Sequence, residues 1–570
     1  MHSATLLLCA LLDNAHIVEP SSAEHIDCLN TIAALTWKIA GSRHSIGTSS
    51  SWRASGLSLR RWLPHRTCHR PIVLFIHPSS CCSAKTHPIH FPRALHLAVS
   101  FLGSTLLATP SMPGLSPPIH FLWQPTSFLC RKLPRRARHR EIRSKRIKQL
   151  FNHLSTQQSN MSAELWQDVP LAPPDSIFKL TAAYKADPYE KKVNLGVGAY
   201  RDDNDKPWVL PVVNKASHIL LSDETLDHEY LPITGLVSFT SAAAKLILGP
   251  TSPAIQDERA VSVQTISGTG ANHLGALFLS KFYKWNGTPT IWLSNPTWAN
   301  HHAIFKNVGI QPAEYPYYDP KTIGLDFSGF IGALQNAPER SVFLLHACAH
   351  NPTGVDPTQE QWKSVADIMI AKKHYAFFDC AYQGFASGDL DKDAWSVRHF
   401  VERGVPLLVC QSFAKNAGLY GERVGALHVI PGTKEAAERV RSQLSVLQRS
   451  EISNPPTYGA RVVSLILNDA ALFEEWKEDI RTMAGRIIAM RKELHRLLTE
   501  ELKTPGNWDH IVNQIGMFSF TGISGEQSKQ LVEKAHVYLT GNGRISMAGL
   551  NSHNIRYFAS CLDGVVRGTL

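Results

Sequence analysis

Lys415 lies in a short polar loop whose neighbours are able to support chemistry. The stretch QSFAKNAGLYGERVG (411–425) follows the apolar run VPLLVC and places Ser412 three residues before the lysine and Arg423 eight residues after it. A lysine amine acts in enzymes as a nucleophile and as a base, although a lysine taken alone is more often a solvated residue of a surface loop. The groups that the rest of the chain brings to this loop decide between the two interpretations.

Two further loops carry polar groups directly after an apolar run. The run AVSVQTI is followed by SGTGA and then by a helical pattern. Free N–H groups and the helix dipole at such a helix start favour an anion, and the candidate donors there are Ser267, Gly268 and Thr269. Asp379 ends the run YAFFD, with Tyr382 three residues later. A carboxylate in this place can partner a protonated ring nitrogen. For both loops an ordinary helix cap is the simpler alternative.

The loops NPTWANH and HNPTG add an aromatic face and an amide. Trp298 offers a flat stacking surface with His301 as a supporting group, and Asn351 follows the run FLLHACAH. Taken singly, the first is usually a core tryptophan and the second an Asn-Pro turn. Taken in order, the five loops supply an anion grip, a stacking ring, an amide, a counter-ion and an amine. These are the groups that one cofactor needs, pyridoxal 5'-phosphate.

The elements that must position these loops alternate between strands and helices. Between about 260 and 430, short apolar runs alternate with helical stretches, which predicts an α/β fold with a mainly parallel sheet buried between helices. Ligands of such sheets gather beyond the carboxyl ends of the strands, where these loops lie. A long helix is expected after 433, further helix over 462–503, and a smaller α+β domain at the end of the chain.

Several motifs in this order resemble those of the class I pyridoxal-phosphate-dependent aminotransferases. They are VNLGVGAYRDD, SGTGA, NPTWANH, HNPTG, FFDCAYQGF, QSFAKNAGLYGERVG and SNPPTYGAR. The resemblance covers residues 161–570 and implies the fold-type I architecture, with a large domain and a smaller α+β domain. We expect an arm and the start of the small domain at 161–205, the large cofactor-binding domain at 206–480 and the small domain at 481–570.

The resemblance also implies a role for each candidate residue. Lys415 would attach the cofactor and move the substrate α-proton, Asp379 would keep the ring nitrogen protonated, and His301 would brace Asp379. Trp298 would stack on the ring, with Tyr382 and Asn351 beside the ring oxygen. The phosphate would be held by Ser267, Gly268, Thr269, Ser412 and Arg423, joined by Tyr230 of the neighbouring subunit. The substrate would be held by Gly198, Trp298, Asn351, Arg544 for its α-carboxylate, and Arg449 of the neighbour for its distal carboxylate.

The activity implied is a two-step transfer of an amino group between L-aspartate and 2-oxoglutarate in a homodimer with shared sites. Its partners would be dicarboxylate amino and keto acids, and the alternative is an aromatic amino acid aminotransferase of the same family. One departure from the family pattern follows Arg449, where the chain reads Ser450, Glu451, Ile452. Glu451 is expected to be able to pair with Arg449 and weaken dicarboxylate binding.

Residues 1–160 differ in composition from the rest of the chain. They hold 19 of the 58 lysines and arginines but only five of the 47 acidic residues, and they lack sustained periodicity. The stretch RKLPRRARHREIRSKRIKQL (131–150) permits a nucleic-acid patch, and the acid-poor composition permits a mitochondrial presequence of unusual length. The interpretation we favour is an extension that is not normally translated, with Met161 as the start.

The chain carries few signals for membranes or metals. The start is a poor secretory signal because no basic residue precedes its apolar stretch, and residues 94–109 are short for a bilayer. Beyond 160 there are four cysteines, Cys348, Cys380, Cys410 and Cys561, without close CxxC spacing, which argues against a zinc site and fits a reducing compartment. We expect a cytoplasmic enzyme with no membrane or nucleic-acid partner and no metal.

Overall fold

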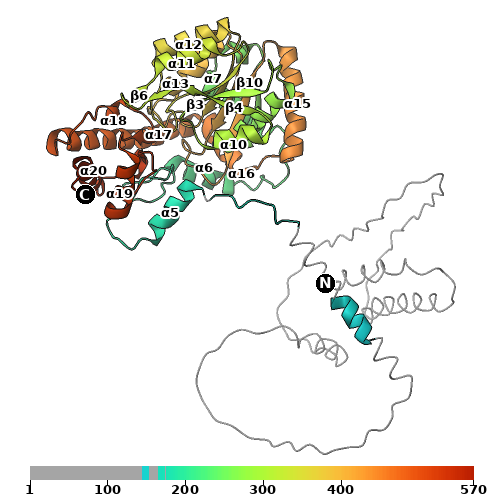
Figure 1. Cartoon of the computed structure of the whole chain (residues 1–570). Helices are drawn as coiled ribbons and strands as arrows, with labels where there is room; N and C mark the ends of the chain where they lie inside the picture. The colour runs from blue at the N-terminus through green and yellow to red at the C-terminus, as the bar shows by residue number, and fades with distance from the viewer. Residues whose placement is uncertain (1–143, 153–164, 174) are drawn as a thin grey trace, which may run out of the picture. The chain divides into compact units, whose positions relative to one another are not determined.

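The computed structural model describes residues 144–152, 165–173 and 175–570. Residues 144–152, at the end of the basic stretch, form an exposed helix, and the expectations for residues 1–143 lie outside the described residues. None of the helices in the described ranges combines the length and the apolar character that a bilayer crossing requires. The remaining elements lie within residues 175–570 (Figure 1).

A seven-stranded sheet forms the centre of this part, in the order β2-β10-β9-β8-β7-β3-β4. Strands β9, β8, β7, β3 and β4 are parallel to one another, whereas β10 is antiparallel to both β2 and β9. The mainly parallel α/β fold expected from the sequence is confirmed. The strands are β2 (Val261–Ile266), β3 (Thr290–Asn295), β4 (Gln311–Pro316), β7 (Val342–His346), β8 (Tyr375–Cys380), β9 (Leu407–Ser412) and β10 (Val424–Ile430).

Helices cover both faces of this sheet, because alternate residues of a strand point to opposite faces. In β7, Phe343 and Leu345 pack into one apolar cluster while Val342 and Leu344 pack into another. The second cluster is closed by α9 (Ser267–Phe282), α10 (Asn300–Asn307) and α15 (Lys434–Glu451). The first is closed by α7 (Val237–Leu248), α8 (Pro253–Gln256), α11 (Phe327–Asn336), α12 (Gln359–Ala371) and α14 (Trp395–Glu402).

A third apolar cluster joins the sheet to the C-terminal part through α17 (Ala470–Arg496). The boundary expected at 480 falls inside this continuous helix. Figure 1 shows α17, α18, α19 and α20 at the end of the molecule away from α15. The other elements are α5 (Ser176–Ala186), β1 (Val193–Asn194), α6 (Pro211–Leu221), β5 (Tyr318–Asp319), β6 (Gly324–Leu325), α13 (Leu390–Asp393), α16 (Tyr458–Asn468), η3 (Leu497–Glu501), α18 (His510–Asn513), β11 (Phe518–Phe520), α19 (Gly525–Ala535), β12 (Val537–Tyr538), β13 (Arg544–Ser546), η4 (Met547–Gly549) and α20 (Ile555–Arg567).

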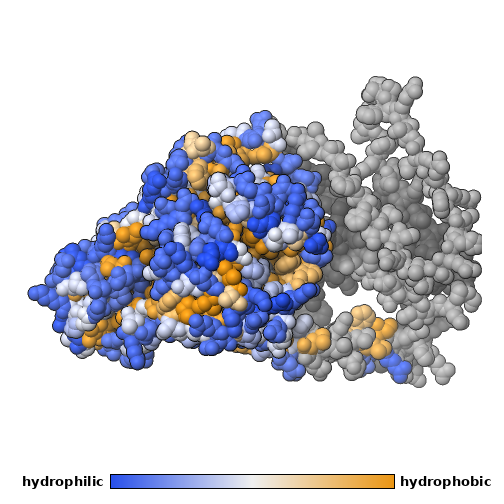
Figure 2. Space-filling model, turned by 90° about the horizontal axis from the view of Figure 1, so that it is seen from above, coloured by the Kyte–Doolittle hydropathy of each residue, from blue (hydrophilic) through white to orange (hydrophobic). Residues whose placement is uncertain are grey.

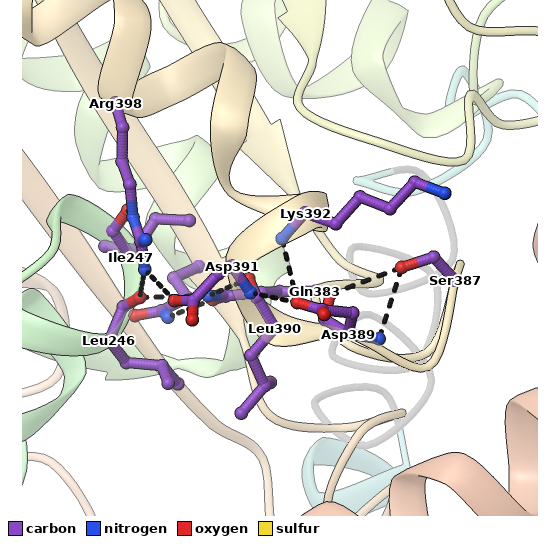
Figure 3. A network of polar contacts seen from close by, with 10 residues as sticks. Leu246, Ile247, Gln383, Ser387, Asp389, Leu390, Asp391, Lys392 and Arg398 are labelled. Atoms are coloured by element: carbon purple, nitrogen blue, oxygen red, sulfur yellow. Dashed lines mark hydrogen bonds and ion pairs between the residues drawn. The ribbon is translucent and has the colours of Figure 1, made fainter.

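A polar network fixes the loop that follows β8 (Figure 3). Arg398 of α14 donates to the carbonyl oxygens of Leu246 and Ile247, at 3.0 and 3.3 Å, and so satisfies orphan carbonyls at the end of α7. Gln383 donates from Nε2 to the same Leu246 oxygen at 3.0 Å and to the Leu390 oxygen at 3.2 Å. The chain just beyond Tyr382 is therefore bonded both to the end of α7 and to the start of α13.

Candidate active site

The carboxyl ends of the strands open into a cavity of about 440 Å³. It is bounded by loops after β2, β3, β7, β8 and β9 and by residues of the C-terminal part. The interpretation of Lys415 as an ordinary solvated lysine is therefore excluded, because it lines this cavity. Eleven other candidates from the sequence also line this cavity: Gly198, Ser267, Gly268, Thr269, Trp298, Asn351, Asp379, Tyr382, Ser412, Arg423 and Arg544.

One wall of the cavity is the start of α9, which begins at Ser267. Ser267 Oγ lies 3.2 Å from Ser412 Oγ, and a Cβ on Gly268 would lie 3.0 Å from the Ser412 Cβ, so this position requires a small residue. Ser267 and Arg423 both have left-handed backbone, with φ of 60° and 55°, and Ser267 N donates to Arg423 O at 2.9 Å. Strained residues of this kind persist where the surrounding structure holds them, often at functional sites. The wall has hydroxyls, helix N–H groups and a guanidinium, which suits a phosphate.

Two side chains, His301 and Thr297, support the Asp379 carboxylate at the end of β8. His301 Nε2 lies 3.1 Å from Asp379 Oδ2, and its Nδ1 lies 2.8 Å from Thr297 Oγ1. Burial by itself would raise the pKa of Asp379, but the His301 hydrogen bond and the positive fields around it outweigh burial and hold this pKa below its usual value. Asp379 is therefore a stable anion inside the protein, as a counter-ion for a protonated ring nitrogen must be.

The amine of Lys415 faces the same cavity from the loop after β9. Its Nζ lies 5.1 Å from the centre of the Tyr382 ring. Desolvation lowers the pKa of Lys415, Asp379 opposes this effect, and Arg423 adds to it. A lysine with a lowered pKa is more often neutral and so is a better nucleophile and base.

Arg544 at the start of β13 brings a cation from the C-terminal part. Its Nη2 donates to Gly196 O at 2.9 Å, and the guanidinium lies 4.3 Å from the centre of the Phe518 ring. Its buried Nε has no hydrogen-bond partner among the described residues, and the same holds for Asn351 Oδ1. Buried polar atoms are normally paired, so these two atoms identify where a ligand would supply the missing partners.

Two predicted residues lie outside the cavity of the single chain. Tyr230 is 81% exposed, and Arg449 is exposed near the end of α15. Hydrogen bonds nevertheless connect their segments, because Asn454 accepts from Arg449 Nη1 at 3.3 Å and donates to Leu231 O at 2.7 Å. The two residues therefore belong to one surface of the chain.

The expectation that Glu451 pairs with Arg449 is wrong. Glu451 Oε2 instead lies 3.0 Å from His273 Nε2 on α9, and Arg449 Nη1 donates to Ser453 and Asn454. Helix α15 packs against α9, which brings Glu451 beside His273, while Arg449 bonds to residues that follow α15.

Among the groups that line the cavity and that sequence reasoning missed are His346, Tyr420 and Phe518. Burial lowers the pKa of His346 to about 3, so this ring is neutral beside the His301–Asp379 pair. Its place at the end of β7, in the run FLLHA, was a usable signal, because strand ends meet at this edge. The other two carry no comparable local pattern.

The amino-acid sequence of this chain matches a family model and several known proteins. The family model described as aminotransferase class I and II matches residues 190–562. The cytoplasmic aspartate aminotransferase of Saccharomyces cerevisiae is 53% identical over 415 residues, which cover 71% of this chain and 98% of that protein. The cytoplasmic enzyme of Schizosaccharomyces pombe is 49% identical over 407 residues, which cover 71% and 99%.

Solved structures agree with this assignment. The aspartate aminotransferase from Saccharomyces cerevisiae cytoplasm matches with a TM-score of 0.69 and 52% identity, covering 72% of this chain and all of that one. An aromatic-amino-acid aminotransferase from Burkholderia pseudomallei, covalently bound to pyridoxal phosphate, matches with a TM-score of 0.68 and 38% identity, covering 70% and 99%. The chain belongs to the class I and II aminotransferase family. It is a pyridoxal-phosphate-dependent transaminase.

Proposed function

We propose that the protein is an aspartate aminotransferase, which converts L-aspartate and 2-oxoglutarate to oxaloacetate and L-glutamate. The observation that carries this proposal is that Lys415, Asp379 and Arg544 line one cavity in a chain about half identical to two cytoplasmic aspartate aminotransferases. The aromatic aminotransferases among the solved structures are more distant, at 38–39% identity. The relatives' names also favour the cytoplasm.

The residues of the cavity fit pyridoxal 5'-phosphate. The unpartnered Asn351 Oδ1 and the wall formed by the start of α9 give it an amide and a phosphate site. When bound, this cofactor supplies an electron sink for the charge that forms at the substrate α-carbon. Its phosphate would be held by Ser267, Gly268, Thr269, Ser412 and Arg423, and its ring by Trp298, Asn351, Asp379 and Tyr382.

Two side chains of this protein then control the positions of two protons, one on the substrate α-carbon and one on the ring nitrogen. Lys415, with its lowered pKa, takes the proton from the substrate α-carbon and returns it later. Asp379, kept anionic by His301, holds a proton at the ring nitrogen. Trp298 lines the same cavity and would stack on the ring.

Substrate recognition depends on arginine. A planar guanidinium binds a carboxylate through two parallel hydrogen bonds, and Arg544 has an unpaired Nε with which to do so. It would bind the α-carboxylate beside Gly198, and Arg449 would bind the distal carboxylate of dicarboxylate substrates.

Arg449 and Tyr230 can act only if the enzyme is a homodimer in which each enters the other subunit's cavity. Their exposure in the single chain supports this arrangement, as do the exposed apolar side chains Val237, Val446 and Tyr458 on α7, α15 and α16. The surface in Figure 2 has apolar areas among hydrophilic ones. Large exposed apolar areas commonly mark interfaces.

The test of the proposed function compares amino donors. Purified enzyme is supplied with pyridoxal phosphate and 2-oxoglutarate, and glutamate formation is measured with aspartate and with phenylalanine. A higher kcat/KM for aspartate is expected. A preference for phenylalanine would establish the aromatic alternative, and a loss of both activities on removal of Lys415 is the control.

A separate experiment tests the alternative for the basic segment. Binding of a nucleic acid by the full chain but not by residues 161–570, measured as a salt-dependent mobility shift, would support that alternative.

A further inference from the structure

A hydrogen-bonded histidine–glutamate pair connects α9 and α15 close to Arg449, the residue proposed to face the neighbouring subunit. Glu451 is the last residue of α15, and its Oε2 lies 3.0 Å from His273 Nε2 on α9. The two side chains are 40% and 37% exposed in the single chain. Arg449, two residues earlier, donates from Nη1 to Ser453 and Asn454 and forms no ion pair with any described residue.

Glu451 and Arg449 are close in sequence, but their side chains bond to different partners. Glu451 is the last residue of α15 and bonds to His273 on α9, whereas Arg449 bonds to Ser453 and Asn454. A free carboxylate in this place would compete with a substrate carboxylate for the guanidinium, because both are anions suited to the same planar fork. In the structure, the Glu451 carboxylate is bound to His273 instead.

We propose that the His273–Glu451 pair sets the selectivity for dicarboxylate substrates by holding Glu451 away from Arg449. The inference rests on the proposed function, in which Arg449 binds the distal carboxylate. His273 and Glu451 are positioning residues, since neither contacts the substrate. They influence only the step in which a second carboxylate is recognised, so amino acids with a single carboxylate are unaffected.

The test uses the holoenzyme and four variants, with kcat and KM measured for aspartate, 2-oxoglutarate and phenylalanine. His273→Ala frees Glu451, and the KM values for both dicarboxylates should rise by about two- to fivefold, the range that an exposed charge interaction supports, with kcat nearly unchanged. His273→Lys supplies another donor that can bind Glu451 and should restore the wild-type KM. The double variant His273→Ala/Glu451→Gln has no free carboxylate and should also return to the wild-type KM. KM for phenylalanine should stay constant throughout.

The fourth variant is a matched control. His495→Ala breaks another exposed histidine–carboxylate pair, to Asp509 at 3.1 Å, and should change no KM. Melting temperatures are recorded for every variant, and His273→Leu, which also lacks a donor, replaces His273→Ala if the latter does not fold.

The outcomes separate the inference from the proposed function. If wild-type enzyme turns over aspartate well but His273→Ala leaves its KM unchanged, the inference is overturned and the proposed function stands. The same holds if the double variant keeps the raised KM, or if KM rises equally for phenylalanine, because a structural effect then explains the change. A wild-type enzyme that does not turn over aspartate overturns both.

Discussion

Arg544→Lys tests how the cavity recognises a substrate carboxylate. In the structure, Nη2 of Arg544 bonds to Gly196 O at 2.9 Å, the guanidinium lies over the ring of Phe518, and Nε has no partner. Desolvation lowers the pKa of Arg544, so its environment is one in which charged hydrogen bonds are strong. Lysine keeps the positive charge but not the planar fork.

The expected loss follows from counting hydrogen bonds. A hydrogen bond to a charged group contributes about 1.5–3 kcal/mol, and lysine retains one of the two. We therefore expect kcat/KM to fall roughly 10- to 150-fold in Arg544→Lys. Arg544→Ala leaves the substrate carboxylate buried without a partner, at a cost of about 3–5 kcal/mol, so its loss should be roughly 10²- to 10⁴-fold.

The assay compares aspartate with phenylalanine, which share the α-carboxylate but not the second carboxylate. Both Arg544 variants should lose similar factors with the two substrates, whereas Arg449→Ala should lose activity with aspartate alone. The reasoning is refuted if Arg544→Lys impairs aspartate and leaves phenylalanine unchanged, because Arg544 would then serve the distal carboxylate. Unchanged melting temperatures are the control for folding.

Four other predictions test the remaining groups. Lys415→Ala should reduce turnover by many orders of magnitude yet retain the cofactor after dialysis, as measured by absorbance, since the phosphate wall remains; near-normal turnover would locate the chemistry elsewhere. Asp379→Asn should slow α-proton removal, followed by stopped flow, far more than it weakens substrate affinity, and a change in affinity alone would contradict its role. Refolding Lys415→Ala with Arg449→Ala should restore about a quarter of wild-type activity, because half of the sites in half of the dimers are whole; no gain in proven mixed dimers would contradict shared sites. Desolvation raises the pKa of the partly buried Asp356 to about 6, so its contribution to stability is full below about pH 4 and is lost as pH rises through about 6; Asp356→Asn should flatten the melting temperature over that range, and an unchanged profile would show that other groups dominate.

Much of the sheet could be predicted because its strands are short apolar runs that end in polar loops. The runs at 260–266, 341–347 and 375–379 became β2, β7 and β8. Strand β4 (Gln311–Pro316) could not be predicted in this way. It lies at the sheet edge, contains two prolines and has mostly exposed or half-buried residues, which is a pattern that only an edge strand tolerates.

The candidate site was predictable where position in the sheet decides function. Asp379 lies at the carboxyl end of β8 and Lys415 follows the neighbouring strand β9, so the strand-end rule places them together. Arg544 could be found only by resemblance, because it comes from a distant part of the chain and folding alone brings it to the cavity. Glu451 was given the wrong partner, since the choice between Arg449 and His273 depends on how α15 packs against α9, which local sequence does not specify.

The bonds of Gln448 and Asn454 have a consequence for how the enzyme responds to dilution. Asn454 fastens Leu231, next to Tyr230, to the loop after α15, and Gln448 donates from Nε2 to Ile233 O and Gln264 O. Hydrogen bonds therefore hold together the segments that carry Tyr230 and Arg449, the two residues proposed to enter the other subunit. When subunits separate, a cavity would lose its phosphate tyrosine and its distal arginine together, so specific activity should fall in a single transition as the enzyme concentration drops below the dimer dissociation constant, with cofactor release at the same concentration.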